Sequence, residues 1–197
     1  MVELKLRPRQ VDILKVALKL LADGGCHALT IRRIADELEI SEPAIYRHFQ
    51  SKKELLKALY SYVWSRLSSE VYPLARGDGD GADRLGKAIR GTLEFLHRNK
   101  GVTLVLLSEA IHHDDPELKD AMLSLVRRFQ GIIREILEDG VDEGSFRNDL
   151  CVDLASQAVV GFLQSSAMLS LLRGVDCDAE TCTSGFLDTM LKGIVER

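Results

Sequence analysis

The chain has 197 residues, of which 46% are hydrophobic and 28% charged. This composition suits one soluble unit of one or two small domains with a hydrophobic core, and it excludes a fibrous or disordered chain. The net charge of −4 is unevenly distributed, because residues 1–57 carry 11 Lys and Arg against 8 Asp and Glu. This basic end has a net charge of +3 and the remainder −7, so a nucleic acid is expected to bind near the N-terminus.

The start of the sequence predicts a cytoplasmic protein, and the cysteines predict free thiols. The first ten residues, MVELKLRPRQ, lack the continuous apolar region and the small-residue cleavage site of a signal peptide. The cysteines have no CxxC spacing and no histidines at zinc-finger distances, which predicts free thiols that contribute to packing. They are Cys26, Cys151, Cys177 and Cys182.

Apolar residues at helical spacing predict two amphipathic helices at the start of the chain, the first from Pro8 and the second after Thr30. The connection ELEIS then leads to a short third helix that Ser41 is expected to cap. In this third helix, Ile45 and Phe49 are expected to face the core.

Ser51 and Glu54 form the S-x-x-E capping box that opens a fourth helix. We expect that helix to end near Val71, because Pro73 follows it. Five further helices are expected beyond the loop PLARGDGDGAD. Their predicted ranges are 82–98, 102–112, 116–139, 152–172 and 179–196. The predicted fold class is therefore all-α, with about nine helices and no strand alternation.

The second and third predicted helices have the lengths and the tight connection of a helix-turn-helix, in which the second helix enters the DNA major groove. Because Ile45 and Phe49 face the core, the helical period turns the other side chains of the third helix largely outward. Lys52, expected to be unpaired where the fourth helix begins, would meet a phosphate together with the free N–H groups of that helix. The outward residues are Glu42, Pro43, Ala44, Tyr46, Arg47 and His48.

The stretch GCHALTIRRIADELEISEPAIYRHFQSKKELL resembles the DNA-binding signature of the tetracycline-repressor (TetR) family of one-component regulators. One position departs from the family pattern: Glu39 stands in the turn where the family usually has Gly. Either Glu39 adopts a left-handed conformation or the turn is wound differently. The pattern is met by Gly25, Thr30, Ile34, Ala35, Ile40, Ser41, Tyr46, Arg47, His48, Phe49 and Lys52.

The resemblance implies two kinds of DNA-contacting residue. Some would hold the phosphate backbone, and others would face base edges, where Arg suits guanine, Glu accepts from cytosine, and Ala or Pro touches a thymine methyl. The implied phosphate contacts are Thr30, Tyr46, His48 and Lys52, and the implied base contacts are Arg32, Glu42, Pro43 and Ala44.

With this resemblance, we expect a three-helix DNA-binding domain at residues 1–50 and a larger helical ligand-binding and dimerisation domain at residues 51–197. One helix-turn-helix makes too few contacts to select a site, so a homodimer on a palindromic double-stranded DNA operator is expected.

The last two predicted helices supply the expected dimer interface. The segment 154–172 is apolar on nearly all sides, which predicts burial on both faces, and two helices from each subunit would form a four-helix bundle. The segment is near the length of a membrane span, but Gln157, Gln164 and four serines argue against one. The expected interface residues are Ala155, Val159, Phe162, Leu163, Leu187, Met190, Leu191 and Ile194.

If the resemblance holds, the middle helices bind a small-molecule effector, and their large apolar side chains favour a hydrophobic one. The alternative is that these side chains simply fill the core. No cofactor is expected. The candidate effector-binding residues are Tyr60, Trp64, Phe95, Leu104, Leu107, His112, Phe129, Ile133 and Phe162.

A second class of function stays open because of two Glu-x-x-His pairs, Glu94 with His97 and Glu109 with His112. This i, i+3 spacing is the one that di-iron carboxylate bundles use, with oxidoreductase or metal-storage functions. Phosphate loops, nucleophile elbows and Ser/His/Asp arrangements are absent from the sequence, so we otherwise expect no enzyme. The main hypothesis is a transcriptional repressor that its effector releases from DNA.

Overall fold

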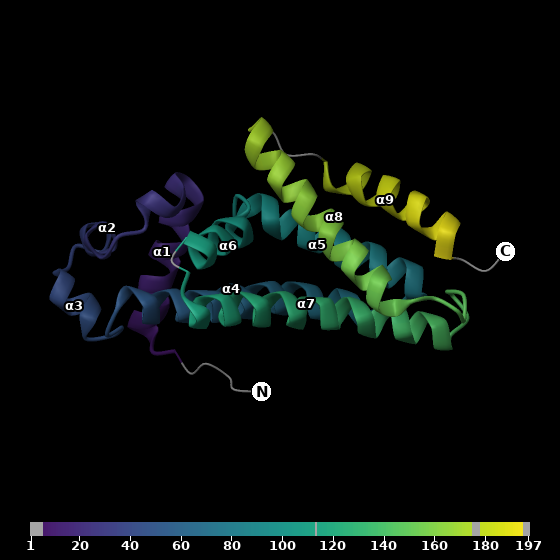
Figure 1. The fold of residues 1–197 in the computed structure, drawn as a ribbon, viewed down its shortest axis with the longest axis horizontal. Helices are drawn as coiled ribbons and strands as arrows, with labels where there is room; N and C mark the ends of the chain where they lie inside the picture. The colour runs from purple at the N-terminus through teal and green to yellow at the C-terminus, as the bar shows by residue number, and fades with distance from the viewer. Residues whose placement is uncertain (1–5, 113, 175–177, 195–197) are drawn as a thin grey trace. The chain divides into compact units, whose positions relative to one another are not determined.

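The computed structural model describes residues 6–112, 114–174 and 178–194, without the side chains of Cys26, His112 and residues 191–194. These residues form nine helices and include no strand (Figure 1), which confirms the predicted fold class. The helices are α1 (Pro8–Ala28), α2 (Ile31–Glu37), α3 (Glu42–Tyr46), α4 (Lys52–Ala75), α5 (Gly81–Arg98), α6 (Val102–His112), α7 (Pro116–Asp142), α8 (Val152–Arg173) and α9 (Ala179–Ile194).

The helix boundaries differ most from the sequence expectation at Pro73, which lies inside α4 and does not end it. A proline in the last turn of a helix removes only one backbone bond. The N–H of Arg76 still bonds the carbonyl of Tyr72 at 3.2 Å, so the helical turn closes around Pro73. At its other end, α4 opens with the predicted capping box.

The chain divides into two compact units, and the division does not follow the expected boundary at residue 50. One unit comprises residues 1–65 and 99–125, and the other comprises residues 66–98 and 126–197. We call them the first and second units. Residues of α4 and α7 contribute to both.

In the first unit, α1 packs on α2 and α6, and α2 packs on α3. The predicted inward residues of these helices are buried, among them Leu14 and Ile34. Ile45 and Phe49 are also buried, at 0% and 2% exposed, as their spacing predicts. The core of the first unit therefore fixes the rotation of α3 about its own axis.

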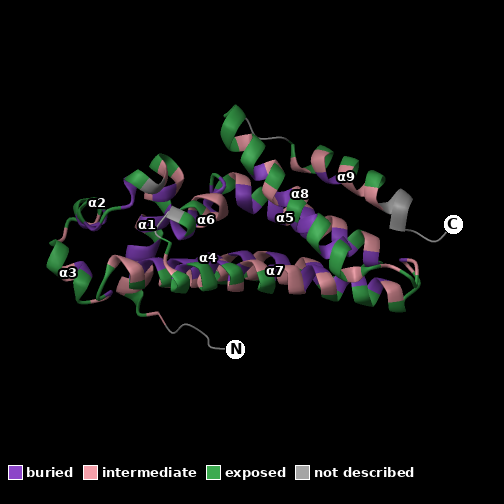
Figure 2. Cartoon of the chain, viewed as in Figure 1, coloured by how far each residue is buried: buried purple, intermediate pink, exposed green. Residues whose placement is uncertain are grey.

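In the second unit, α5 packs against α8 and α9, and its apolar face is fully buried. Ala155, Val159 and Leu163 of α8, which the sequence predicts at the dimer interface, are buried within this single chain. The apolar stretch had shown only that α8 is apolar on all sides, not which face the protomer itself covers. The large apolar residues that stay exposed on α8 are Leu154, Met168, Leu169, Leu171 and Leu172. Figure 2 shows exposed stretches, in green, along this helix.

The remaining predicted interface residues belong to the packing of α8 and α9 or lie outside the description. Phe162 stacks on Phe186 of α9, with ring centroids 4.0 Å apart. Leu187 and Met190 are half-buried. The side chains of Leu191 and Ile194 lie outside the described residues.

By length and composition, α8 is the one helix within the described ranges that is apolar enough to cross a membrane. Its buried residues, such as Val159 and Leu163, pack in the core of the second unit, which is the pattern of a core helix in a helical protein.

The cysteine prediction holds for Cys151, which is a free thiol, although it is exposed and contributes nothing to the core. It is wrong for Cys182, which is disulfide-bonded. Sequence spacing does not exclude such a bond, because the fold decides which cysteines meet. Cys177 and the side chain of Cys26 lie outside the described residues.

Candidate nucleic-acid interface

The turn between α2 and α3 is a Schellman-type helix ending with glutamate at the position that favours glycine. Glu39 has a φ of +53°, so the left-handed alternative is the one adopted. The N–H of Ile40 bonds the carbonyl of Ala35 at 3.0 Å, which closes the six-residue loop of the motif. Local backbone bonding therefore sets the direction in which α3 leaves α2.

The N-terminus of α2 is capped by Thr30, whose hydroxyl oxygen accepts a hydrogen bond from the N–H of Arg33 at 3.1 Å. A threonine hydroxyl also carries a proton, so the exposed Thr30 side chain keeps a donor for an acceptor outside the protein. One turn along, the side chain of Arg32 is 81% exposed and only 3.9 Å from the carboxylate of Asp36. Both α2 residues remain accessible to a duplex.

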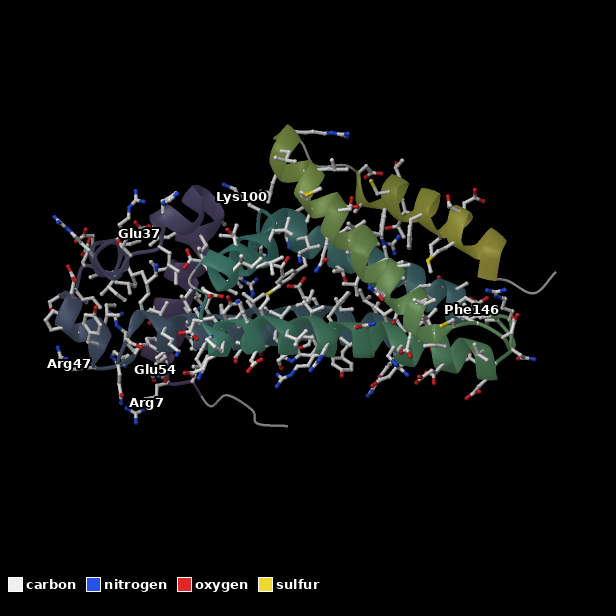
Figure 3. All side chains as sticks on the ribbon, in the orientation of Figure 1. Arg7, Glu37, Arg47, Glu54, Lys100 and Phe146 are labelled. Atoms are coloured by element: carbon white, nitrogen blue, oxygen red, sulfur yellow. The ribbon has the colours of Figure 1, made fainter. Side chains whose placement is uncertain are left out.

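The outward face of α3 carries the side chains predicted from its helical period. Glu42, Pro43, Tyr46 and Arg47 are exposed. Ala44 and His48 are half-buried. Arg47 extends away from the ribbon where α3 ends (Figure 3).

One detail of the α3 prediction is wrong, because Ser41 stands at the N-cap position but its side chain makes no capping hydrogen bond. A contact from α1 adds support that the sequence pattern had not indicated. The side-chain amide of Gln10 donates to the carbonyl of His48 at 3.2 Å. This bond ties the end of α3 to the first turn of α1 across 38 positions in the sequence.

The first turn of α4 has the predicted capping box. The N–H of Glu54 donates to the hydroxyl oxygen of Ser51 at 3.1 Å, and the Glu54 carboxylate accepts from the N–H of Gln50 at 2.6 Å. Glu54 therefore reaches one residue further back than the simplest form of the box requires.

Lys52 is not unpaired, which corrects the sequence expectation. Its Nζ lies 3.7 Å from a carboxylate oxygen of Glu109 on α6, and the Glu109 side chain is only 4% exposed. The Lys52 side chain itself remains 37% exposed. No signal in the sequence pairs these two residues, because they are brought together by the packing of the first unit.

Next to Lys52, a second set of charges joins α4 to the start of α7. Lys53 pairs with Asp115 at 2.9 Å and Glu117 at 2.5 Å, and Lys57 pairs with Glu117 at 2.7 Å. The hydrogen bond from Lys53 lowers the pKa of Asp115 and of Glu117 below their usual values. The hydrogen bond that Lys53 donates to Glu117 raises the pKa of Lys53 in turn. We call Lys53, Lys57, Asp115 and Glu117 the α4–α7 clamp.

Taken together, these helices present arginine, amine and hydroxyl groups of α2, α3 and α4 to solvent, as a DNA-binding surface requires. Comparison with known proteins decides the family. Residues 13–59 match the family model of bacterial regulatory proteins, tetR family, and residues 78–168 match that of the tetracyclin repressor-like C-terminal domain. The chain belongs to the TetR family. It is therefore a DNA-binding transcriptional regulator and not an enzyme.

Known proteins resemble this chain in sequence or in fold. Nucleoid occlusion factor SlmA of Vibrio cholerae is 27% identical over 132 residues, which cover 66% of this chain and 67% of that protein. The fatty acid degradation regulator FadR of Bacillus halodurans is 19% identical, covers 98% of this chain and 100% of its own, and has a TM-score of 0.84. FadR of Bacillus subtilis, solved in complex with stearoyl-CoA, is 18% identical, with coverages of 93% and 98% and a TM-score of 0.81.

The candidate effector residues of this TetR-family chain divide between the two units. Tyr60, Trp64, Leu104 and Leu107 belong to the first unit, as does His112, whose side chain lies outside the described residues. Phe95, Phe129, Ile133 and Phe162 belong to the second. Tyr60, Phe95, Phe129 and Ile133 are buried, while Trp64, Leu104, Leu107 and Phe162 are half-buried.

The second unit also contains a cleft that none of the predicted effector residues line. It has a volume of about 610 Å³ and lies beside α5 and the start of α9. Its lining is mostly charged, with Lys87, Arg90, Glu94 and Glu180, and the guanidinium of Arg90 pairs with Glu180 at 2.5 Å. A paired, charged lining differs from the apolar lining expected of a pocket for a hydrophobic effector.

The di-metal hypothesis finds no support in the TetR-family fold. Glu94 is exposed and lies 3.9 Å from Arg98, whereas Glu109 is buried beside Lys52. Across the part of the chain that is described, His, Cys, Asp and Glu side chains form no group of three or more that could hold a metal ion.

Proposed function

We propose that this TetR-family regulator is a cytoplasmic repressor that binds a palindromic operator as a homodimer and leaves it when a hydrophobic effector binds. The observation that carries the proposal is the orientation of α3. Its apolar residues, Ile45 and Phe49, are locked in the core, so its polar residues stand outward next to an accessible Arg32. A short helix held in this way is suited to the major groove.

In the proposed complex, two kinds of contact have separate roles. Thr30, Tyr46, His48 and Lys52 hold phosphates and thereby set the register of the protein on the duplex. Arg32, Glu42, Pro43 and Ala44 face base edges and select the sequence. Arg47, at the exposed end of α3, adds a positive charge to the same surface.

The proposed dimer forms through the exposed face of α8. Residues 154, 158, 161, 165, 168 and 172 are all exposed and alternate by four and three positions, which is the spacing of a helix–helix seam. We call this set the α8 seam. Its ends are Leu154 and Leu172, at 65% and 76% exposed, and its middle residues are small, which permits close approach of a second helix. The α8 seam replaces Ala155, Val159 and Leu163 as the proposed contact between subunits.

The proposed effector is a long acyl chain carried on coenzyme A. Two observations support this class: the large apolar residues of the middle helices, and the stearoyl-CoA bound by FadR of Bacillus subtilis, which shares the fold. Binding of effector and binding of DNA are reciprocally linked. An effector that favours one conformation lowers the affinity for the operator by some factor, and bound DNA lowers the affinity for the effector by the same factor.

The test begins with selection of bound duplexes from a random pool. Enrichment of a palindromic sequence with half-sites about 34–36 Å apart supports the proposal, and failure to enrich any sequence contradicts it. Long-chain acyl-CoA is then titrated into the complex. It should release the DNA over the same concentration range in which it changes the fluorescence of Trp64, the single tryptophan. Free coenzyme A is the matched control and should do neither.

A further inference from the structure

A buried carboxylate lies directly behind one of the proposed phosphate contacts. Glu109 of α6 is 4% exposed, and its Oε2 lies 3.7 Å from Nζ of Lys52, whose side chain is 37% exposed. Acidic side chains are almost never buried to this extent without a partner. The ammonium group of Lys52 therefore lies close to a carboxylate inside the protein, while its side chain stays partly accessible to the solvent from which a DNA phosphate would approach.

The position of Glu109 relative to α4 is fixed by packing and not by the flexibility of two surface side chains. One helical turn before Glu109, the backbone carbonyl of Leu106 accepts a buried hydrogen bond of 2.8 Å from the hydroxyl of Tyr60 on α4. Leu106 and Ala110 are themselves buried, and α6 packs on α1. Two polar contacts, at Lys52 and Tyr60, thus hold α6 in register with the first turns of α4.

The charges set the sign of the effect on DNA binding. A phosphate that approaches Lys52 is attracted by the ammonium and repelled by the buried carboxylate that lies 3.7 Å from it. Salt and water screen exposed charges, but a buried carboxylate is screened much less. Ordering of the long Lys52 side chain by the pair works in the opposite direction. The Lys52 side chain is only 37% exposed, so the surrounding protein already restricts it, and we expect the repulsion to outweigh the ordering.

We propose that Glu109 is a built-in competitor for Lys52, which restrains DNA affinity and makes it depend on the position of α6. The inference rests on the phosphate contact proposed for Lys52. Any movement that takes Glu109 away from α4 lets Lys52 bind the phosphate backbone of DNA more tightly. By reciprocal linkage, a duplex held by Lys52 loosens the bond between α4 and α6.

The experiment measures binding of a fluorescent duplex of mixed sequence over a range of salt concentrations, because a phosphate contact acts on every sequence. Three variants are compared with the unaltered protein: Glu109→Gln, Lys52→Ala and the double variant. Glu109→Gln should bind about threefold to thirtyfold more tightly at low salt. Its dependence on salt should steepen by up to about one unit of slope. In the Lys52→Ala background, Glu109→Gln should change neither quantity.

The matched control is Glu135→Gln, which removes an equal charge from an exposed ion pair with Arg76. It should leave affinity and slope unchanged, since a general loss of negative charge is not the proposed cause. If Glu109→Gln does not fold, Glu109→Met fills the buried site with an apolar side chain of similar length, and it should tighten binding in the same way.

Three results would overturn the inference. Glu109→Gln could leave affinity unchanged or weaken it, which would make Glu109 neutral or a support for Lys52. It could tighten binding equally in the Lys52→Ala background, which would place its effect elsewhere. Lys52→Ala could itself leave affinity and slope unchanged, which would remove the phosphate contact. In each case the unaltered protein still enriches an operator from the random pool, whereas failure of the proposed function means that it enriches none.

Discussion

At Glu39 the backbone takes a φ of +53°, a conformation that glycine adopts freely and a residue with a Cβ adopts at a cost. The Schellman-type bond from Ile40 to Ala35 holds the turn in this shape. Since Glu39 is exposed, its side chain contributes little to the core. The strain is therefore tolerated because the flanking helices over-determine the turn.

The first prediction concerns this turn. Glu39→Gly should raise the free energy of unfolding by about 0.5–1 kcal/mol, because relief of the left-handed strain exceeds the extra freedom that glycine gives the unfolded chain. Urea unfolding followed by circular dichroism measures the change. Arg127→Gly, at an exposed position inside α7, is the control and should lower stability by about 1 kcal/mol. A loss of stability in Glu39→Gly would contradict the prediction.

Individual residues of the site differ in how far the sequence could predict them. The outward face of α3 followed from the positions of Ile45 and Phe49, because a helical period fixes all other side chains once two are placed. The pairing of Lys52 with Glu109 did not follow, because 57 positions separate the two and only tertiary packing joins them. The same is true of Gln10 and His48.

At the scale of elements, the α4–α7 clamp joins the first turns of α4 to the start of α7 through charges that the folded state keeps ionised. The pKa values of Asp115 and Glu117 lie below their usual 3.8 and 4.5 because Lys53 donates hydrogen bonds to both. A carboxyl group with a lowered pKa stabilises the folded state above its unfolded pKa. That stabilisation is lost as the pH falls through the lowered, folded value.

The second prediction follows from the lowered pKa of Glu117. Glu117→Gln should lower the Tm at pH 7, and the difference from the unaltered protein should persist down to about pH 4.5 and shrink below it. Thermal unfolding across this pH range measures the difference. Asp120→Asn, on the same helix but outside the clamp, should show no such pH dependence. A difference that stays constant at low pH would mean that the clamp is not its source.

Helices were predicted more reliably than helix faces. Apolar spacing and caps placed the helices to within a few residues, because both signals are local. The exception was α4, which continues through Pro73. In α8, residues of every face are apolar, so periodicity carried no information about which side meets α5 and which stays exposed.

At the scale of the whole molecule, a palindromic operator has two half-sites, and each half-site needs the helix-turn-helix of one chain. Two copies of the chain are therefore required, and the α8 seam is the proposed contact between them. Exposed apolar residues of this number on one helix are unusual for a protein that stays monomeric in water. Leu154, Met168 and Leu172 belong to the α8 seam, whose exposed positions follow the four- and three-residue spacing of a helix–helix contact.

The third prediction tests that seam. Met168→Glu with Leu172→Glu should convert the dimer into monomers, because charges in an apolar seam lose their hydration without gaining partners. Sedimentation measures the mass at micromolar concentration. Leu123→Glu, at an exposed leucine of α7, is the matched control and should remain dimeric. A stable monomer of the unaltered protein would contradict the dimer itself.

The fourth prediction separates reading from positioning in the DNA complex. Lys52→Ala removes a proposed phosphate contact, so it should weaken binding to the selected operator and to an unrelated duplex alike, and lower the salt slope by about one unit. Tyr46→Phe should also weaken both duplexes alike, since a hydroxyl on a phosphate carries no sequence information. Lys15→Ala, on an exposed position of α1, is the control and should change little.

The most direct test of the regulator is the DNA-sequence preference of the Arg32→Ala variant. It is measured at each base pair as the ratio of the affinity for the selected operator to the affinity for an operator changed at that base pair. The ratio should fall at one position in each half-site, with a loss of about 1–3 kcal/mol on the operator and little on unrelated DNA. If Arg32→Ala and Lys52→Ala both leave duplex affinity untouched in a folded dimer, the helix-turn-helix does not contact DNA as proposed.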